Sequence, residues 1–417
     1  MPSVCFYFQV HQPHRLRRFS VFDRTPDYFD EPANREVCRR VATKCYLPAN
    51  RVVLDLIRRF EGRFKVAYSV TGTAMEQFEH YSPEVLASFR QLADTGCVEF
   101  LAETYHHSLA WLYSEQEFKE QVAQHHEAVR RHFDQDPRVF RNTELIYDDS
   151  LARAVSELGY EGICTEGVDH LLGVRSCNFL YEPPGDVPLK LLLKNYRLSD
   201  DIAFRFSDRS WPAWPLTAEK FAAWVSQING HGHCCNLFLD YEALGEHQWA
   251  ETGIFDFLRH LPGEILKHPD NDFATPGELL DRYPAVDTLQ VPTSISWADT
   301  ERDLSAFCGN AMQSHALQEL FKLEKELRTA ANPADRADIL ADWRRLSTSD
   351  HVYYMATKSH EGDSAVHRLL SPYDSPYDGY INFMNVLDNL SSRVRTIGRK
   401  ATTEPGAGAK HKPAGLV

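Results

Sequence analysis

Two acidic residues, Glu144 and Asp240, each stand at the end of an apolar run that is typical of a buried strand. Glu144 lies in the stretch VFRNTELIYDDS (139–150), and Asp240 lies in CNLFLDYE (235–242). A carboxylate in such a position is costly unless it is paired, hydrogen-bonded or functional. Taken singly, each has a simpler explanation: Glu144 could stabilise the start of a helix near Asp149, and Asp240 could be a helix N-cap.

As a pair, the two residues suit hydrolysis of a glycosidic bond, which needs two carboxyl groups across a sugar ring. Their separation decides the outcome: about 5–5.5 Å leads to retention of the anomeric configuration, and roughly 6.5–9.5 Å leads to inversion. Spacing along the chain does not determine this separation. The sequence therefore indicates the chemistry without its stereochemical course.

Two further segments carry candidate ligand-binding side chains. His11 follows an apolar run, and Pro13 forces the chain to turn there, which favours binding of a polar ligand over a purely structural role. In YHHSLAWLY (105–113), His107 could hydrogen-bond to a sugar and Trp111 could stack on it. A core position explains Trp111 equally well.

Other catalytic motifs are missing or misplaced. The tract HGHCC (231–235) contains zinc-ligand residue types, but it precedes a strand, at the opposite end of a barrel from the cleft, and lacks a second pair at zinc spacing. No glycine-rich phosphate loop or G-x-S-x-G elbow follows a predicted strand. We therefore expect no metal and no cofactor, and nucleotide and serine-hydrolase functions are disfavoured.

The segments that must position these residues alternate between short apolar runs and stretches with helical periodicity. Near-continuous apolar strands separated by helices predict a parallel sheet covered by helices, and about seven such units favour a barrel over an open doubly wound sheet. The predicted strands are 3–10, 64–70, 97–103, 138–144, 161–166, 235–242 and 272–276, and clear helical stretches are 84–94, 115–133 and 216–228.

Polar side chains follow most of these runs, where active sites gather in parallel α/β barrels. They are His11 after the first run, Thr71 and Glu76 after the second, Glu103, His106 and His107 after the third, Glu144 after the fourth, and Asp240 with Glu242 after a late one. The pattern predicts a cleft at this end of the sheet.

The character of the chain changes after about residue 288. Helical periodicity dominates 301–330, 334–347 and 380–394. The last residues contain Gly, Pro and Lys without apolar periodicity. We therefore expect a catalytic barrel over 1–288, a helical bundle over 289–398 and a disordered basic tail over 399–417.

Composition limits the partners. The chain has 417 residues and a formal net charge of −14, which disfavours nucleic acid because that partner requires Lys and Arg. No secretory signal is evident, and no segment approaches the roughly 18 consecutive apolar residues of a membrane span. Nine scattered cysteines suggest reduced thiols and a cytoplasmic location. No heptad seam or other self-association signature stands out, so the sequence does not decide the oligomeric state.

Five motifs together resemble, in the same order, those of glycoside hydrolase family 57. They are HQPHRL (11–16), GTAMEQF (72–78), FRNTELIYDD (140–149), FLDYEALGEHQW (238–249) and ATPGELL (274–280). The third and fourth look like the α-amylase subgroup of the family, as do TSDHVYYMATK (348–358) and SPYDSPYDGYINFMNVL (371–387).

The resemblance implies a retaining enzyme that cuts α-1,4-glucans such as glycogen, starch or maltooligosaccharides through a covalent glycosyl-enzyme intermediate. It implies an incomplete (β/α)7, TIM-barrel-like fold followed by a helical bundle that helps to close the cleft, and it requires no metal. Glu144 would be the nucleophile and Asp240 the general acid/base, so their environments must separate the two pKa values. His11, Glu76, Glu242 and Trp249 fall in motifs that line the sugar site.

Three alternatives remain at this stage. A 4-α-glucanotransferase or branching-type transglycosylase would act on the same substrates. A metal-dependent polysaccharide deacetylase would need an Asp and His triad at the strand ends. A non-catalytic glucan-binding protein would use the same cleft to bind glucan without cutting it. The sequence also does not decide whether Asp350 or Asp374 of the helical region reaches the cleft.

Overall fold

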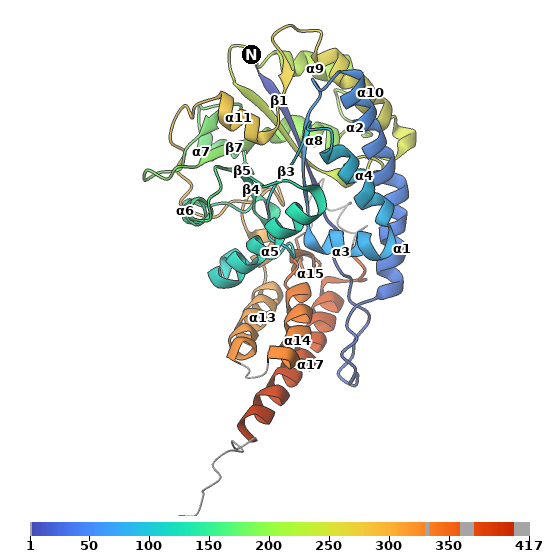
Figure 1. The fold of residues 1–417 in the computed structure, drawn as a ribbon, viewed down its shortest axis with the longest axis vertical. Helices are drawn as coiled ribbons and strands as arrows, with labels where there is room; N and C mark the ends of the chain where they lie inside the picture. Colours follow the sequence, from blue (N-terminus) through green and yellow to red (C-terminus); the bar gives the residue numbers. More distant parts are fainter. Residues whose placement is uncertain (1, 330–332, 359–370, 404–417) are drawn as a thin grey trace, which may run out of the picture.

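The computed structural model describes residues 2–329, 333–358 and 371–403, and Figure 1 shows parallel strands with helices packed around them. In the first sheet, β1 (Ser3–Val10) pairs in parallel with β2 (Val66–Val70) and β8 (Cys234–Asp240). Strand β3 (Val98–Phe100) extends the sheet beyond β2, and β9 (Asp272–Phe273) pairs with the start of β1. Every residue of β1 is buried, as expected for a central strand covered on both faces.

The second sheet has the order β4–β5–β7–β6. Strands β4 (Val139–Arg141), β5 (Gly162–Glu166) and β7 (Lys190–Lys194) are parallel, and the short β6 (Leu180–Tyr181) is antiparallel to β7. The predicted parallel α/β organisation is therefore confirmed. The sequence prediction missed β6 and β7.

Backbone contacts join the two sheets at both edges. Beyond β3, the Ala102 nitrogen donates to the Val139 carbonyl over 3.0 Å, and the Arg141 nitrogen donates to the Ala102 carbonyl over 2.8 Å. After β7, the Asn195 nitrogen donates to the Asn236 carbonyl in β8 over 2.8 Å. The succession of parallel strands thus returns to β8, and the segments that follow the strands meet at one end.

Helices cover the outside of the strands. Helix α5 illustrates why they form: Ser114 caps its first turn by accepting from the Glu117 nitrogen, basic residues occupy its last turn, and Asp134 ends it in the left-handed conformation. The helices up to residue 282 are α1 (Glu31–Val41), α2 (Leu47–Arg59), α3 (Gly72–Tyr81), α4 (Pro83–Ala93), α5 (Glu115–Phe133), α6 (Asp149–Glu157), α7 (Asp169–Leu172), α8 (Tyr196–Ala203), α9 (Ala218–Ser226), α10 (Ile254–Ile265) and α11 (Pro276–Arg282).

The remaining helices gather below the sheets in Figure 1, where α17 packs against α13 and α14. They are α12 (Ser305–Cys308), α13 (Ala311–Thr329), α14 (Pro333–Leu346), α15 (Ser349–Tyr353) and α17 (Pro376–Thr403). Helix α17 includes the first residues, 399–403, of the predicted tail, and residues 404–417 lie outside the described residues. Within the described ranges, no helix is both long and apolar enough to cross a membrane.

A continuous hydrophobic core connects the second sheet to these helices. One cluster of buried side chains includes Ile163 of β5, Leu191 of β7, Leu320 of α13 and Trp343 of α14. The Trp343 indole is fully buried, and its N–H donates to the Leu320 carbonyl over 2.8 Å. The helical region is therefore packed as part of the same body as the second sheet.

A buried ion pair network reinforces this junction. Glu117 of α5 is fully buried and accepts from Arg328 of α13 over 2.6 Å and from Arg344 of α14 over 2.7 Å. Both arginines also pair with Glu120, one turn along α5. Each charge has partners, which is the condition under which buried ions are tolerated.

Replacing Glu117 by Ala should destabilise the protein, because it removes the fully buried carboxylate that both arginines share at the junction. We expect the free energy of unfolding to fall by about 3 kcal/mol, measured by urea denaturation. Glu115→Gln is the matched control, since Glu115 lies on the same helix with an exposed side chain. Equal effects of the two substitutions would contradict the anchoring role of Glu117.

Candidate active site

A cavity of about 780 Å³ lies at the carboxyl ends of the parallel strands. Five side chains that the sequence analysis proposes for the site line it: His11, His107, Glu144, Asp240 and Glu242. They come from segments that follow β1, β3, β4 and β8. The strand-end positions read from the sequence therefore do meet in space.

Glu144 sits in an unusual turn. Strand β4 ends at Arg141, and the chain enters a short helical turn, Thr143–Leu145, in which Glu144 has the left-handed angles φ 57° and ψ 25°. Such angles are uncommon for a residue with a β-carbon. The Glu144 carbonyl accepts hydrogen bonds from Ser296 Oγ over 2.9 Å and from the Trp297 backbone nitrogen over 3.1 Å, which hold the turn in place.

The helix-start explanation for Glu144 is wrong. The N-cap of α6 is Asp148, whose side chain accepts from the Ser150 and Leu151 nitrogens. The capping explanation of Asp240 also fails, because its side chain makes no capping hydrogen bond to the turn that follows β8. Both carboxyl groups are available to the cavity.

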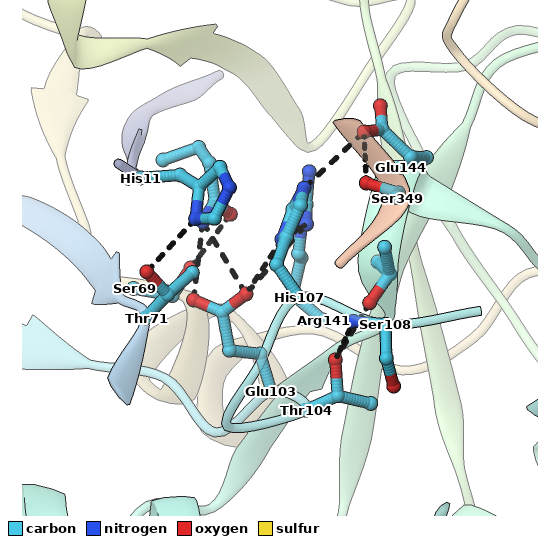
Figure 2. Close-up of polar contacts among 12 residues, drawn as sticks. His11, Ser69, Thr71, Glu103, Thr104, His107, Ser108, Arg141, Glu144 and Ser349 are labelled. Carbon is cyan, nitrogen blue, oxygen red and sulfur yellow. Dashed lines mark hydrogen bonds and ion pairs between the residues drawn. The ribbon is translucent and has the colours of Figure 1, made fainter. Parts of the chain in front are cut away.

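Three donors surround the Glu144 carboxylate, and Figure 2 shows two of them, His107 and Ser349. His107 Nε2 lies 3.2 Å from Oε1, Ser349 Oγ donates to the same oxygen over 3.1 Å, and the Trp297 indole N–H donates to Oε2 over 2.9 Å. Burial alone would raise the pKa of Glu144, but the hydrogen bond and charge of His107, the charge of Arg141 and the Trp297 hydrogen bond lower it overall. Glu144 is therefore held as a carboxylate.

His107 links Glu144 to a second buried acid, Glu103. Its Nδ1 lies 3.3 Å from Glu103 Oε2, so the two carboxylates flank one imidazole, as Figure 2 shows. Burial alone would lower the pKa of His107, but the bonds to Glu103 and Glu144 raise it to about 9. His107 is therefore a cation at neutral pH and donates from both ring nitrogens.

His11 stacks on His107, with ring centroids 4.2 Å apart. Burial and the neighbouring charge of His107 lower the pKa of His11, so it is neutral. Its Nδ1 lies 2.9 Å from Thr71 Oγ1 and its Nε2 lies 2.9 Å from Asp350 Oδ2. Asp350 of α15 thus reaches the cavity, whereas the side chain of Asp374 is 93% exposed.

Asp240 has the opposite electrostatic environment from Glu144. Burial and the negative charge of Glu144 raise the pKa of Asp240 to about 6, despite the nearby positive charges of Arg141 and Lys194. Glu242 follows in the next turn, and burial together with Asp240 raises its pKa to about 8. The Tyr46 hydroxyl donates to the Glu242 carboxyl group. Near neutral pH the site therefore contains both an ionised and a readily protonated carboxyl group.

Two residues proposed from the sequence do not line the cavity. Glu76 of α3 pairs with Arg345 over 2.9 Å and with His14 over 3.2 Å, which gives it a structural explanation. Trp249 is 62% exposed, with the Lys44 ammonium group 5.9 Å from its ring centroid. A role for either residue in substrate binding stays a prediction.

Three residues at the site are not among those predicted from the sequence: Lys194, Trp297 and Ser349. Lys194 ends β7 and lines the cavity, so the strand-end rule applied to the overlooked strand would have found it. Trp297 and Ser349 lie beyond the predicted barrel segment. Trp297 lies in none of the quoted motifs, and Ser349 lies in TSDHVYYMATK (348–358), but neither local sequence connects its residue with Glu144.

The zinc interpretation of HGHCC finds no support. His233 directly precedes β8, at the amino end of the strand, and stacks on Tyr283 with ring centroids 4.9 Å apart. In residues 2–329, 333–358 and 371–403, no group of three His, Cys, Asp or Glu side chains could hold a metal ion. The Asp and His triad that a metal-dependent deacetylase needs is therefore not found among these residues.

Comparison with known proteins identifies the family of the chain. A family model described as "Glycosyl hydrolase family 57" matches residues 5–292. Over 411 residues the chain is 41% identical to a Methanocaldococcus jannaschii protein described as "Putative alpha-amylase", and the match covers 95% of this chain and 86% of that protein.

Solved structures share the fold at low sequence identity. A GH57-type branching enzyme from Pyrococcus horikoshii has a TM-score of 0.65 and 13% identity, with 94% of each chain covered. A 4-alpha-glucanotransferase from Thermococcus litoralis has a TM-score of 0.65 and 14% identity, with 87% of this chain covered but only 56% of that enzyme. With the family match and the close curated relative, the chain belongs to glycosyl hydrolase family 57 and is a glycoside hydrolase.

Proposed function

We propose that the enzyme is a retaining hydrolase of α-1,4-glucans, of the α-amylase type, with Glu144 as nucleophile and Asp240 as general acid/base. The observation that carries this proposal is the opposite shift in pKa of two carboxyl groups that line one cavity. The relative described as "Putative alpha-amylase" supports the choice of substrate, which would be glycogen, starch or maltooligosaccharides.

In the same proposal, residues 1–288 form an incomplete (β/α)7 barrel, and the helical bundle over 289–398 helps to close the cleft. The return of the strand order to β8 supports the barrel. The side chains of Ser349 and Asp350, which reach Glu144 and His11 from α15, support the closing role of the helices.

In the first step, the Glu144 carboxylate attacks the anomeric carbon while Asp240 gives its proton to the leaving glycosidic oxygen. The carbon–oxygen bond to the leaving sugar breaks as the ester to Glu144 forms. This step requires environments that keep the Glu144 carboxyl group ionised and the Asp240 carboxyl group protonated. The His107 cation stabilises the charge of Glu144 before attack and again when the ester is hydrolysed.

In the second step, Asp240 takes a proton from water as the water attacks the anomeric carbon and Glu144 leaves as a carboxylate. The ester form of Glu144 is neutral, so the charge that raises the pKa of Asp240 is gone. Asp240 therefore remains ionised and can act as the base. One electrostatic coupling thus serves both steps.

Trapping the intermediate tests the assignment. Asp240→Asn should react with α-maltosyl fluoride, because fluoride leaves without an acid, and should then accumulate the adduct because no base activates water. Mass spectrometry of the digested protein should locate the glycosyl group on the peptide that contains Glu144. An adduct on another carboxylate would falsify the assignment.

The controls for this experiment also address a catalytically silent binding protein. The double variant Glu144→Gln, Asp240→Asn should give no adduct. Glu144→Gln alone should lower kcat by about 10³-fold or more, because the covalent route is lost. If Glu144→Gln leaves glucan binding and every measured activity unchanged, the protein is a glucan-binding protein and the enzymatic proposal fails.

The dependence of kcat/KM on pH should follow the two carboxyl groups. Activity should decline above about pH 6, because Asp240 has a pKa of about 6 and must carry a proton in the first step. On the acidic side, kcat/KM should fall only at pH values below those at which Glu ordinarily titrates, because the pKa of Glu144 is lowered.

A carboxyl NMR titration checks the coupling directly. Glu144→Gln should move the pKa of Asp240 down toward its ordinary value, because the negative charge of Glu144 is one of the two main causes of its elevation. Asp374→Asn is the control, since that side chain is 93% exposed. An unchanged Asp240 titration in Glu144→Gln would show that burial alone sets it.

The nearest alternative activity is transfer of glucan segments. A glucanotransferase and a branching enzyme share the fold of this chain, which is the reason to test for it. Incubation with maltoheptaose separates the two activities by chromatography of the products. Hydrolysis gives only shorter chains, which is the result we expect. Chains longer than the substrate would show that the enzyme transfers glucan segments as well.

A further inference from the structure

We infer that Trp297 is a positioning residue for the nucleophile: its indole N–H, on a ring flanked by two buried cations, fixes the Glu144 carboxylate for attack. The inference rests on the proposed function, since it takes Glu144 as the nucleophile. Neither the sequence motifs nor the family match, which ends at residue 292, includes Trp297.

Trp297 and its neighbour Ser296 hold Glu144 at two places. Ser296 Oγ and the Trp297 nitrogen donate to the Glu144 backbone carbonyl over 2.9 and 3.1 Å. The Trp297 indole N–H then donates to carboxylate Oε2 over 2.9 Å. The backbone contact fixes where the turn lies, and the indole contact fixes how the carboxylate is rotated within it.

The two carboxylate oxygens have different partners. Oε1 lies within hydrogen-bonding distance of the His107 cation and the Ser349 hydroxyl, at 3.2 and 3.1 Å, whereas Oε2 accepts from Trp297. A charged donor and a hydroxyl remain on Oε1 if the indole N–H is lost. The Trp297 contact can therefore be removed without leaving the carboxylate unpaired, and its effect on orientation can be measured separately.

Two cations lie against the indole ring. The Arg141 guanidinium carbon and the Lys194 ammonium nitrogen are each 5.0 Å from the ring centroid, and both residues are almost fully buried. A cation near an aromatic face is attracted to the π electrons and draws them toward itself, most strongly where water is excluded. The loss of electron density makes the N–H a stronger donor to a carboxylate.

An ion network keeps this arrangement in place. Arg302 donates to the Trp297 carbonyl over 3.0 Å and to Glu166 over 3.1 Å, and Lys194 lies 3.3 Å from Asp200. The indole is therefore fixed from its backbone and from its ring face. A donor held in this way keeps the carboxylate in one orientation as it attacks, and orientation of this kind lowers the entropy cost of the reaction.

The test removes the N–H and leaves the ring. Trp297 is replaced by benzothienylalanine, in which sulfur takes the place of the indole nitrogen, so packing and the cation contacts remain. A hydrogen bond to a charged group is worth about 1.5–3 kcal/mol, so kcat/KM should fall about 10- to 100-fold. The fall should be in kcat, with little change in KM, and Tm should be within a few degrees of wild type.

A second readout distinguishes positioning from a purely structural role. Loss of the Trp297 hydrogen bond removes one of the effects that lower the pKa of Glu144, so the acidic limb of the kcat/KM profile should move to higher pH. The alkaline limb, set by Asp240, should move much less. Trp297→Phe should show the same loss of kcat if this variant folds. If Trp297→Phe does not fold, the benzothienylalanine variant alone tests the inference.

Trp224→Phe is the matched control, because Trp224 lies on α9, does not line the cavity and should leave both limbs and kcat unchanged. Unaltered kcat and an unaltered acidic limb in the benzothienylalanine variant would overturn the inference. Failure of the proposed function is separable from this result. It would appear in the trapping experiment as an adduct on a carboxylate other than Glu144, whatever the Trp297 variants do.

Discussion

The ionised state of Glu144 is the condition on which the rest of the site depends. A buried carboxylate tends to take up a proton, because burial penalises the charged form. Here the His107 cation, which is itself kept charged by Glu103, reverses that tendency. A row of alternating charges, Glu103, His107 and Glu144, therefore replaces the hydration that the carboxylate has lost. The raised pKa of Asp240 follows from its own burial and, in part, from the fixed negative charge of Glu144 beside it.

The candidate active site is not contained within the strand-bearing part of the chain. Trp297, Ser349 and Asp350 all come from beyond residue 288, and each contacts a residue that follows a strand. The continuous core between the second sheet and α13 and α14 keeps these contributions at a fixed distance from Glu144. A boundary near residue 288 therefore separates two kinds of secondary structure without separating the site. Residues from beyond this boundary hydrogen-bond to the Glu144 carboxylate directly, as His107 does.

Much of the fold is predictable from the sequence because buried parallel strands are short continuous apolar runs. The predicted runs 3–10 and 235–242 correspond closely to β1 and β8. Strand β7 escapes this rule because its three leucines lie between Lys190 and Lys194. Those charges are satisfied by the Leu280 and Tyr283 carbonyls and by Asp200, which are tertiary contacts that no local pattern reveals.

At the site, too, local sequence predicts some residues and misses those that reach it from distant parts of the chain. His11, His107, Glu144, Asp240 and Glu242 are predictable because each follows a strand, and the geometry of a parallel sheet then brings them together. Trp297 and Ser349 are not, because they lie 153 and 205 residues along the chain from the carboxylate that they contact. Glu76 and Trp249 show the converse, because a place in a motif does not ensure a place in the cavity.

The backbone at Glu144 shows what the chemistry costs the fold. Glu144 and Leu145 are consecutive residues with positive φ, at 57° and 49°, and each such conformation costs about 1–3 kcal/mol in a residue with a β-carbon. Glycine would relieve the cost at the first position but would remove the carboxylate. The turn is instead maintained by the bonds from Ser296 and Trp297 to the Glu144 carbonyl. The Trp297 indole N–H makes a separate bond to carboxylate Oε2, so one short segment supports both the strained backbone and the side chain that the turn presents to the cavity.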